Sequence, residues 1–341
     1  MRLGISEKKI NFKMEPYISF VIPMKEQDFR VILLLKSIRE QNYPQNRIEI
    51  IIIDGGSNPA VLKECKKYNV KIYINIKKKA EGAGMGKDQG IWKSSGDFIV
   101  IAESDIELIG KNWINNMLKP FKEDSEIFAS VPRLYANQKD NISNRYLSYV
   151  GVDPFAIFRS IEGQYELNSK IAKIKKSGYS ILKLDNNNPY CMGSNGFMFK
   201  KDLIKKVGDY AQDVEFIARL ALNNYKKFAV VENAKVWHKN VKNLNDFIKK
   251  RVKWTINYTL PKFTNKEKYE FIWINDKLMF FVFILKNLLF FPNIPISLKK
   301  FYTYRDSAWL LHAPFLLIST LFNIFFAITS KTMIKKIIRS Y

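Results

Sequence analysis

The chain has 341 residues and a formal net charge of +24 at pH 7, from 56 Lys and Arg against 32 Asp and Glu. Hydrophobic residues make up 47% of it, which is enough for a large core and excludes a globally disordered chain. The charge favours an anionic partner such as a phosphorylated substrate, an acidic lipid surface or nucleic acid, although a general lysine and asparagine bias would raise it in the same way. The two cysteines lie far apart and predict neither a disulfide framework nor a cysteine zinc site, which points to a reducing compartment. The first residues have no apolar core of signal-peptide length, so we expect the body of the chain not to be exported.

Strands and helices alternate along the first hundred residues. Apolar runs predict strands at 17–23, 48–53, 70–75 and 98–102. Helical patterns separate them at 27–41, at 59–68 and, after a loop at 77–86, in a short helix through Trp92. Such alternation predicts a doubly wound, mostly parallel α/β sheet with flanking helices. Ligands bind at the carboxyl ends of the strands in sheets of this kind.

The fourth predicted strand ends in two carboxylates, Glu103 and Asp105. Side chains repeat every two residues on extended backbone, so both acids can face one cation or a diphosphate-bound metal. The structural alternative is a polar strand end followed by a turn.

The middle of the chain is less regular. A helix is predicted at 113–121 and a strand at 127–131. Residues 133–183 have no clean period, which is typical of an insertion that shapes a substrate site or of a plain surface excursion. Beyond Cys191 the pattern predicts a strand through Phe199, a helix near 213–222, strands near 228–231 and 234–237, and a helix at 244–258.

Two strongly apolar segments follow Pro261. Residues 278–296 are interrupted by one lysine and two prolines, whereas 308–330 run 23 residues without a charge, which at ~1.5 Å per residue is long enough to cross a bilayer of ~30 Å. Residues 239–341 contain 18 Lys and Arg against 5 Asp and Glu, and basic residues flank both segments. We therefore expect helices that lie in the interface of an anionic membrane surface. Spanning helices and helices packed on the catalytic domain are the alternatives.

A series of motifs occurs in a fixed order along residues 17–258. It comprises Ile22-Pro23 with Glu26, Asp54-Gly-Gly-Ser57, Gly84-Met-Gly-Lys-Asp-Gln-Gly90, Glu103-Ser-Asp105, Gly193-Ser-Asn-Gly196, Gln212-Asp213-Val-Glu215, His238 and Lys250-Arg-Val-Lys253-Trp254. The series resembles the family 2 nucleotide-sugar glycosyltransferases of the GT-A fold. Three departures stand out: Glu103 begins the metal triplet, Gln212 replaces the first acid of the acceptor-side pair, and Lys253 stands where the family usually has Arg before Trp. The last departure weakens the case for a processive synthase.

The resemblance implies roles for these residues. The implied nucleotide-sugar site consists of Pro23, Glu26, Asp54, Gly56, Lys87, Asp88, Glu103, Ser104, Asp105, Lys250, Lys253 and Trp254. The implied acceptor site consists of Gly193, Ser194, Asn195 and Gly196. The implied ligands of Mn²⁺ or Mg²⁺ are Asp105, His238 and Glu103, with Asp105 as the anchor because hard dications prefer oxygen.

Asp213 is the expected general base, because sugar transfer needs a group that takes the acceptor proton. Its structural alternative is a cap at a helix start, and the alternative for His238 is a satisfied surface histidine. Lys250, Lys253 and Trp254 share a helix stripe that could hold a diphosphate or equally form a solvated basic face.

We therefore expect a membrane-associated inverting glycosyltransferase at the cytoplasmic face. It would move a sugar from a UDP- or GDP-sugar to a hydroxyl or phosphate of a lipid-linked glycan or polyprenyl phosphate. The expected domains are a lead at 1–16, a GT-A catalytic domain at 17–260 and a membrane-associated region at 261–341. Within the catalytic domain, residues 133–183 are interpreted as an acceptor-side insertion. An inactive scaffold is one alternative. A nucleic-acid-binding protein is a weaker one, because no recognised motif for that function occurs.

Overall fold

The computed structural model describes residues 14–26, 28–76, 83–155, 174–183, 195–210, 213–254 and 277–329. Its contacts divide the chain into two compact units, Met1–Tyr135 with Leu167–His238 and Ala136–Glu166 with Lys239–Tyr341. This division cuts through the segment interpreted as an acceptor-side insertion. The division reflects contacts between residues and not function, so the functional domains expected from the sequence stay predictions.

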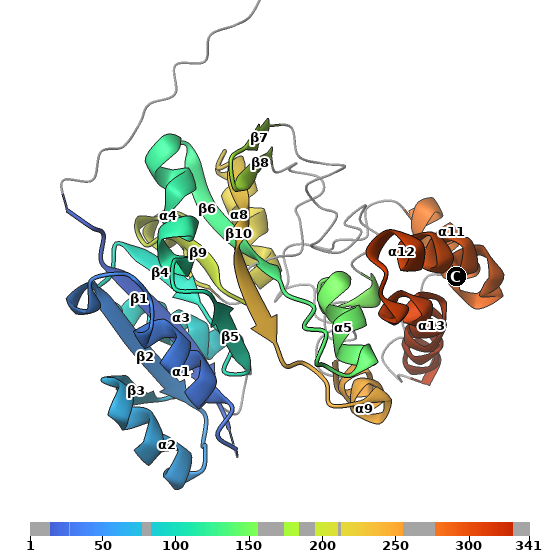
Figure 1. The fold of residues 1–341 in the computed structure, drawn as a ribbon, viewed down its shortest axis with the longest axis horizontal. Helices are drawn as coiled ribbons and strands as arrows, with labels where there is room; N and C mark the ends of the chain where they lie inside the picture. The colour runs from blue at the N-terminus through green and yellow to red at the C-terminus, as the bar shows by residue number, and fades with distance from the viewer. Residues whose placement is uncertain are drawn as a thin grey trace, which may run out of the picture. The chain divides into compact units, whose positions relative to one another are not determined.

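In the described part of the first unit, ten strands form one sheet (Figure 1). They are β1 (Ile18–Met24), β2 (Ile48–Asp54), β3 (Lys71–Ile74), β4 (Phe98–Ile101), β5 (Ile106–Ile109), β6 (Ile127–Leu134), β7 (Ile174–Lys176), β8 (Tyr179–Lys183), β9 (Phe197–Lys200) and β10 (Lys227–His238). The order is β3-β2-β1-β4-β9-β6-β10-β8-β7, and β5 pairs with β10. Strands β3, β2, β1 and β4 run parallel, as do β6 and β10, whereas β9 is antiparallel to both β4 and β6. The predicted mostly parallel α/β sheet is confirmed. β10 is a single strand with an irregularity between Val231 and Lys235, where the sequence pattern predicted two strands.

Helices cover both faces of the sheet. They are α1 (Val31–Arg39), α2 (Pro59–Cys65), α3 (Ala83–Lys93), α4 (Trp113–Glu123), α7 (Asp202–Val207) and α8 (Asp213–Leu222), with short 3₁₀ turns at Gln45–Arg47 and Lys66–Tyr68. On one face Phe20 of β1 packs 6.3 Å from Trp113 of α4, measured between ring centroids. On the other face α3 lies so close that a Cβ added to Gly90 would be 2.4 Å from Cγ1 of Val21. Strands covered on both sides read as continuous apolar runs, which is why β1, β2 and β4 were visible in the sequence.

The second unit is helical in its described part. It contains α5 (Ile142–Tyr149), α9 (Leu244–Trp254), α11 (Lys277–Leu289), α12 (Ile294–Tyr304) and α13 (His312–Thr329), with 3₁₀ turns η5 (Phe291–Asn293) and η6 (Ser307–Leu311). Its core joins Tyr146, Phe247, Trp309 and Phe315 from four of these elements. The amino-terminal half of α13 is therefore packed inside this unit.

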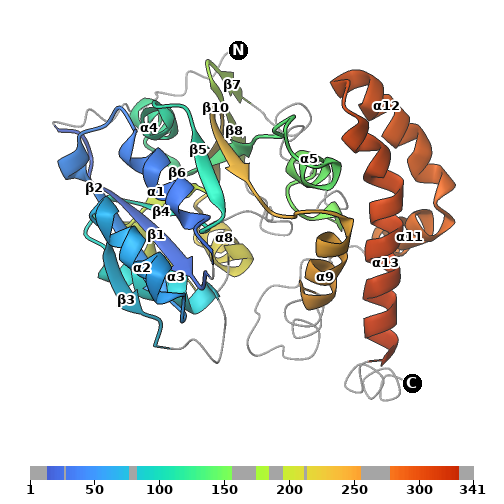
Figure 2. The same cartoon turned by 60° about the horizontal axis from the view of Figure 1, so that its bottom comes forward.

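The apolar carboxyl-terminal helices remain partly exposed. Ser307–Thr329 is long and apolar enough to cross a membrane, and one third of it is buried inside the protein. Leu278–Leu289 and Phe291–Tyr304 would together form a second apolar span, but they meet at an angle of 98°. Figure 2 shows α13 beside α11 and α12, with which it is in contact. Length and composition thus permit membrane association, and a core helix of a soluble protein would pass the same test.

Asp306 organises the polar interior of the second unit. Its carboxylate, 1% exposed, accepts hydrogen bonds from Arg145 Nη2 at 3.0 Å, Gln138 Nε2 at 3.0 Å, Tyr149 Oη at 3.0 Å and the amide of Ala308 at 2.8 Å. Burial alone would raise the pKa of Asp306, but these hydrogen bonds outweigh it and the pKa lies below its usual value. The bond to Ala308 also caps the start of η6.

Candidate active site

The carboxyl ends of the parallel strands carry several of the predicted site residues. Asp54 is the last residue of β2, Glu103 and Asp105 follow β4, and His238 ends β10. Parallel strands end at the same edge of a sheet, so these groups share one edge of the first unit.

Lys87 of α3 joins two of the predicted acids. Its ammonium lies 2.8 Å from Glu103 Oε1 and 3.0 Å from Asp213 Oδ1, with Asp213 Oδ2 at 3.1 Å. The lysine side chain is only 6% exposed. Burial lowers the pKa of Lys87, but the two carboxylates more than compensate and hold it above its ordinary value. Lys87 is therefore a permanent positive charge between Glu103 and Asp213.

Asp213 begins α8 and is the group that the sequence predicts as general base. Burial raises the pKa of its carboxyl, Lys87 opposes the rise, and the pKa stays above its usual value. The side chain is still 29% exposed, so solvent screens part of this effect. Tyr210 donates a hydrogen bond to it and is itself buried, which raises the pKa of the phenol. A carboxylate with a raised pKa is a stronger base than a free aspartate.

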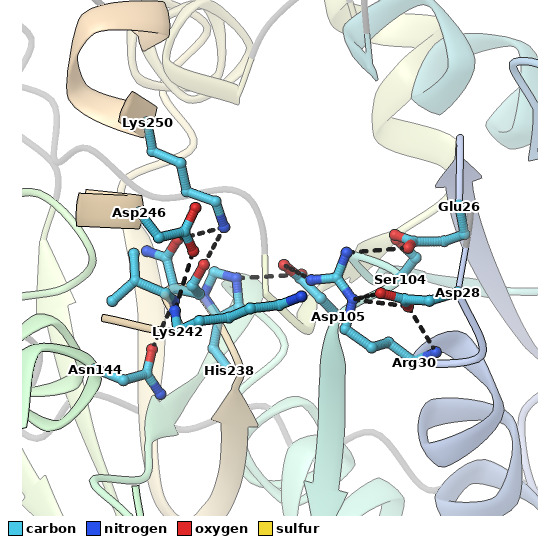
Figure 3. A network of polar contacts seen from close by, with 12 residues as sticks. Glu26, Asp28, Arg30, Ser104, Asp105, Asn144, His238, Lys242, Asp246 and Lys250 are labelled. Atoms are coloured by element: carbon cyan, nitrogen blue, oxygen red, sulfur yellow. Dashed lines mark hydrogen bonds and ion pairs between the residues drawn. The ribbon is translucent and has the colours of Figure 1, made fainter. Parts of the chain in front are cut away.

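Asp105 lies between a histidine and an arginine. Its Oδ1 is 3.2 Å from Nε2 of His238, and its Oδ2 is 3.9 Å from Nη1 of Arg30 (Figure 3). The His238 side chain is 10% exposed and the Asp105 side chain 20%. Asp105 directly precedes β5, which pairs antiparallel with β10 and places Ile106 opposite His238, and this pairing brings the two side chains together. The sequence predicted both as metal ligands.

Glu103 and Asp105 do not face one point in this structure. The backbone turns after β4, so Glu103 contacts Lys87 while Asp105 contacts His238. The described residues contain no group of three or more His, Cys, Asp or Glu side chains placed to hold a metal ion. Asp105 and His238 nevertheless offer an oxygen and a nitrogen donor side by side, a set that suits a divalent ion whose other ligands are diphosphate oxygens and water.

The loop after β1 is tied to the loop after β2. The Glu26 amide donates to Ser57 Oγ at 2.9 Å, and the Ser57 amide donates to Asp54 Oδ1 at 2.8 Å. The Glu26 carboxylate accepts from Ser104 Oγ at 2.5 Å and pairs with Arg30 at 3.2 Å. The residues predicted to bind the nucleotide are therefore positioned by hydrogen bonds within the site itself.

Gly56 leaves open space above this loop. Its φ of +107° favours glycine, and a Cβ built on it would meet nothing within 4 Å. Pro23 lies directly before the end of β1 and is buried. The backbone here could approach a planar group closely, as the sequence motif suggested.

Other predicted residues have structural partners. Asp88 Oδ1 accepts from the amide of Tyr210 at 2.9 Å. Asn195 and Gly196 both have positive φ, and a Cβ on Gly196 would come 2.9 Å from the Trp113 ring. The amide of Gly196 donates to the Ile101 carbonyl at 2.8 Å, which fixes this turn at the end of β4. Gly193 and Ser194 lie outside the described residues.

The basic motif belongs to α9 in the second unit. Lys250 Nζ donates to the carbonyl of Asn240, and the Lys242 amide donates to Asp246 Oδ2 at 3.0 Å (Figure 3). Lys253 is exposed. Trp254 ends the helix, and its side chain is outside what the structure describes.

The sequence analysis missed two residues of this edge, Arg30 and Tyr210. Arg30 precedes α1 and contacts Glu26, Asp28 and Asp105, and these carboxylates together outweigh burial to hold its pKa above the ordinary value. In a chain with 56 basic residues nothing local distinguishes it. Tyr210 lies three residues before Asp213, so its position beside a helix start was the available clue.

Comparisons with known proteins agree with this geometry. Residues 19–208, more than half of the chain, match the sequence model of glycosyl transferase family 2. A dolichyl N-acetyl-α-D-glucosaminyl phosphate 3-β-D-2,3-diacetamido-2,3-dideoxy-β-D-glucuronosyltransferase of Methanococcus voltae is 35% identical over 92 residues, which cover 25% of this chain and 28% of that protein. A glucosyl-3-phosphoglycerate synthase of Petrotoga mobilis is 30% identical over 118 residues, covering 32% of this chain and 36% of that protein. The chain thus matches about a third of the length of these relatives.

The fold also has a solved counterpart. The mannosyltransferase PcManGT from Pyrobaculum calidifontis, solved in complex with GDP-Man and Mn²⁺, superimposes with a TM-score of 0.51 at 12% identity. The superposition covers 99% of this chain and 83% of that one. At this identity the likeness concerns the fold, which is of the GT-A type. The match to the family model over 19–208 identifies the protein as a glycosyltransferase that belongs to glycosyl transferase family 2.

Proposed function

We propose that this protein is an inverting glycosyltransferase that works at a membrane and transfers a sugar from a UDP- or GDP-sugar to a lipid-linked acceptor. The observation that carries the proposal is the convergence of Asp213, Lys87 and Glu103 beside the strand end that bears Asp105. It offers a base and several charged groups for a diphosphate at one sheet edge.

In the proposed reaction Asp213 removes the proton from an acceptor hydroxyl as the oxygen attacks the anomeric carbon. The bond from that carbon to the diphosphate breaks on the opposite face, so the configuration inverts and the proton remains on Asp213. Lys87 and Arg30 would supply positive charge to the departing diphosphate. A divalent ion such as Mn²⁺ or Mg²⁺, held by Asp105 and His238 with Glu103 nearby, would supply further charge neutralisation when bound.

Two observations support a lipid-linked acceptor at an anionic membrane. The Methanococcus voltae relative carries dolichyl phosphate in its name. The second unit exposes apolar side chains on α11 to α13 within a chain segment that is strongly basic. We propose that this unit holds the enzyme on the cytoplasmic face of the membrane.

Nucleotide titration tests the donor site. Calorimetry of the detergent-solubilised protein with UDP and with GDP, each with and without Mn²⁺, should show metal-dependent binding of one nucleotide. Asp105→Asn should weaken that binding at least tenfold, whereas Glu40→Gln, an exposed carboxylate on the first unit, should leave it unchanged. Folded protein that binds neither nucleotide in the presence of metal would overturn the proposal and favour an inactive scaffold.

The chemistry of the acceptor is tested at Asp213. If the acceptor is a hydroxyl, Asp213→Asn should lower kcat by about 10²–10⁴, the usual contribution of a general base, and leave nucleotide binding intact. A polyprenyl phosphate acceptor is already anionic and needs no base. In that case Asp213→Asn would be mild while Asp105→Asn would still be severe.

A further inference from the structure

A cavity lies in the first unit, away from the candidate active site. Its volume is about 550 Å³, and five lysines line it: Lys183, Lys200, Lys206, Lys226 and Lys227. They come from separate elements, since Lys183 ends β8, Lys200 ends β9, Lys206 lies in α7 and Lys227 begins β10. Segments far apart in the sequence thus bring like charges to one hollow.

The cavity is at the opposite edge of the sheet from Asp105 and His238. Lys227 and His238 are the first and last residues of the same strand, β10. At ~3.3 Å per residue they are on the order of 30 Å apart along that strand. A ligand in this cavity would therefore not be the donor bound at the candidate active site.

Carboxylates pair with at least two of these lysines. Lys227 pairs with Asp124 at 3.2 Å and with Glu126, and Lys206 pairs with Asp202 at 3.4 Å. Glu126 and Asp202 are also the acidic residues among those that line the cavity, against five lysines. The hollow therefore carries an excess of positive charge, which concave walls of low dielectric concentrate.

Lys200 is the most unusual of the five. It is half-buried and donates to a neutral acceptor, the carbonyl of Ser125, at 2.9 Å. Burial lowers the pKa of its ammonium, and the attraction of Asp202 and Asp124 does not restore it. An anion in the cavity would stabilise this charge. At the rim the Lys206 ammonium lies 5.7 Å from the centre of the Tyr225 ring, which also lines the hollow.

We propose that this cavity binds a phosphate group carried by a small ligand, either a soluble phosphate compound or the headgroup of an anionic lipid. Lysine ammonium groups bind phosphate as point charges, and several of them around one hollow suit a multiply charged oxyanion. The volume fits a single small ligand and not an extended nucleic acid strand.

The probe is inorganic pyrophosphate, titrated calorimetrically into the full chain in detergent with EDTA present. EDTA removes metal ions, so the proposed metal-dependent donor site does not contribute. Lys183→Gln combined with Lys206→Gln should weaken pyrophosphate binding at least tenfold. The matched control removes the same charge from two exposed lysines, one in α2 and one in the 3₁₀ turn that follows it. This variant, Lys63→Gln combined with Lys66→Gln, should bind pyrophosphate as wild type does.

Two outcomes would overturn the proposal. One is a wild-type protein that does not bind pyrophosphate, and the other is equal weakening in the cavity and control variants, which would indicate only the general charge of the chain. Metal-dependent binding of UDP or GDP is measured on the same samples. It should be unchanged in both variants, so failure of this site and failure of the donor site are told apart.

Vesicles distinguish the two sources of phosphate. Binding to vesicles of phosphatidylglycerol and phosphatidylcholine is compared for the cavity and control variants. If the phosphate belongs to a lipid, the cavity variant should bind the anionic vesicles at least tenfold more weakly than the control. If it belongs to a soluble compound, vesicle binding should be equal and only pyrophosphate binding should fall.

Discussion

Lys87 is the residue on which the candidate active site depends electrostatically. Without its ammonium, the carboxylates of Glu103 and Asp213 would face each other with no cation between them. Like charges in a partly buried site cannot easily ionise together, so loss of the lysine would raise the pKa of Asp213 further.

We therefore predict that Lys87→Met shifts the acidic limb of the pH profile of kcat/KM to higher pH. A base acts only when deprotonated, and loss of the lysine raises the pKa of Asp213 beyond its already raised value. The position of this acidic limb is measured by steady-state transfer assays from pH 4 to 9, with the nucleotide sugar that the titration identifies. Lys87→Arg keeps the charge and should leave the limb near its wild-type position. An unmoved limb in Lys87→Met would show that Asp213 is not the titrating base.

At this scale the sequence identified residues better than it identified their partners. It predicted both Lys87 and Asp213, yet assigned the lysine to the nucleotide site and the aspartate to the role of general base. The two lie 126 positions apart, and no local periodicity records a contact over that separation. Arg30 was missed for a related reason. Its role in the site depends on its contact with Asp105, and only the fold brings these two residues together.

Helix α3 can pack closely against the sheet because residue 90 is a glycine. A Cβ at Gly90 would lie 2.4 Å from Val21 Cγ1 and 3.2 Å from Ile53 Cγ1, so this helix sits directly on β1 and β2. That close approach also brings Lys87, one turn earlier, to the strand ends.

We predict that Gly90→Ala destabilises the protein by about 1–3 kcal/mol. Alanine would gain up to ~1 kcal/mol in helix propensity, but overpacking a tight core costs more than that. Denaturant unfolding followed by circular dichroism measures the difference. Lys93→Ala on the exposed side of the same helix serves as the control and should change stability by less than ~0.5 kcal/mol. A more stable Gly90→Ala variant would mean that α3 can move off the sheet.

The 3₁₀ turn η6 depends on Asp306. We predict that Asp306→Asn lowers the free energy of unfolding by about 3–5 kcal/mol, because it leaves the Arg145 guanidinium buried without its counter-charge.

The contribution of Asp306 to stability depends on pH. Its pKa is lowered in the fold, so the Asp306 carboxylate contributes fully above its unfolded-state pKa of ~3.9, and this contribution is lost as pH falls further. The stability gap between wild type and variant should accordingly be constant from pH 5 to 8 and narrow below about pH 4. Denaturant unfolding at each pH measures it. Asp202→Asn, an exposed ion-pair partner, should cost under ~1 kcal/mol.

Strands and helices could be predicted from the sequence where a single local pattern, such as a continuous apolar run, identified them. Continuous apolar runs revealed β1, β2 and β4, and the paired acids after β4 were recognised as a strand end. The sequence predicted an extended segment through Asp105, whereas the chain turns there because β5 must start at Ile106 to pair with β10. The insertion of β9 between β4 and β6 left no local trace either, since strand order is decided by partners distant in sequence.

At the scale of the whole molecule the exposed apolar side chains of α11 decide how the protein meets a membrane. Phe281 and Leu285 are 63% and 44% exposed and lie one helical turn apart. Burying two such side chains in lipid is worth about 3 kcal/mol or more, roughly a hundredfold in binding.

We therefore predict that Phe281→Asp combined with Leu285→Asp weakens binding to phosphatidylglycerol vesicles at least a hundredfold. Co-sedimentation with vesicles measures the affinity. The control places the same two charges on exposed apolar positions of the first unit, Ile74→Asp with Leu222→Asp, and should bind as wild type does. Equal binding of the α11 variant and the wild type would favour helices that pack on protein.

The order of strands in the sheet also has a consequence for how the protein is made. Strands β1 to β4 lie within one early stretch of chain, but Ile101 of β4 pairs with Phe197 of β9, and Ile127 of β6 pairs with Lys227 of β10. During synthesis the edge of β4 therefore has no neighbour until much of the chain has left the ribosome, and an open strand edge invites pairing with other chains. Contacts this distant also slow folding. Asp213 and His238 come from α8 and β10, which are made after β4, so the candidate active site is completed only after these later elements have been made, and a chaperone that covers β4 in the meantime would raise the yield of active enzyme.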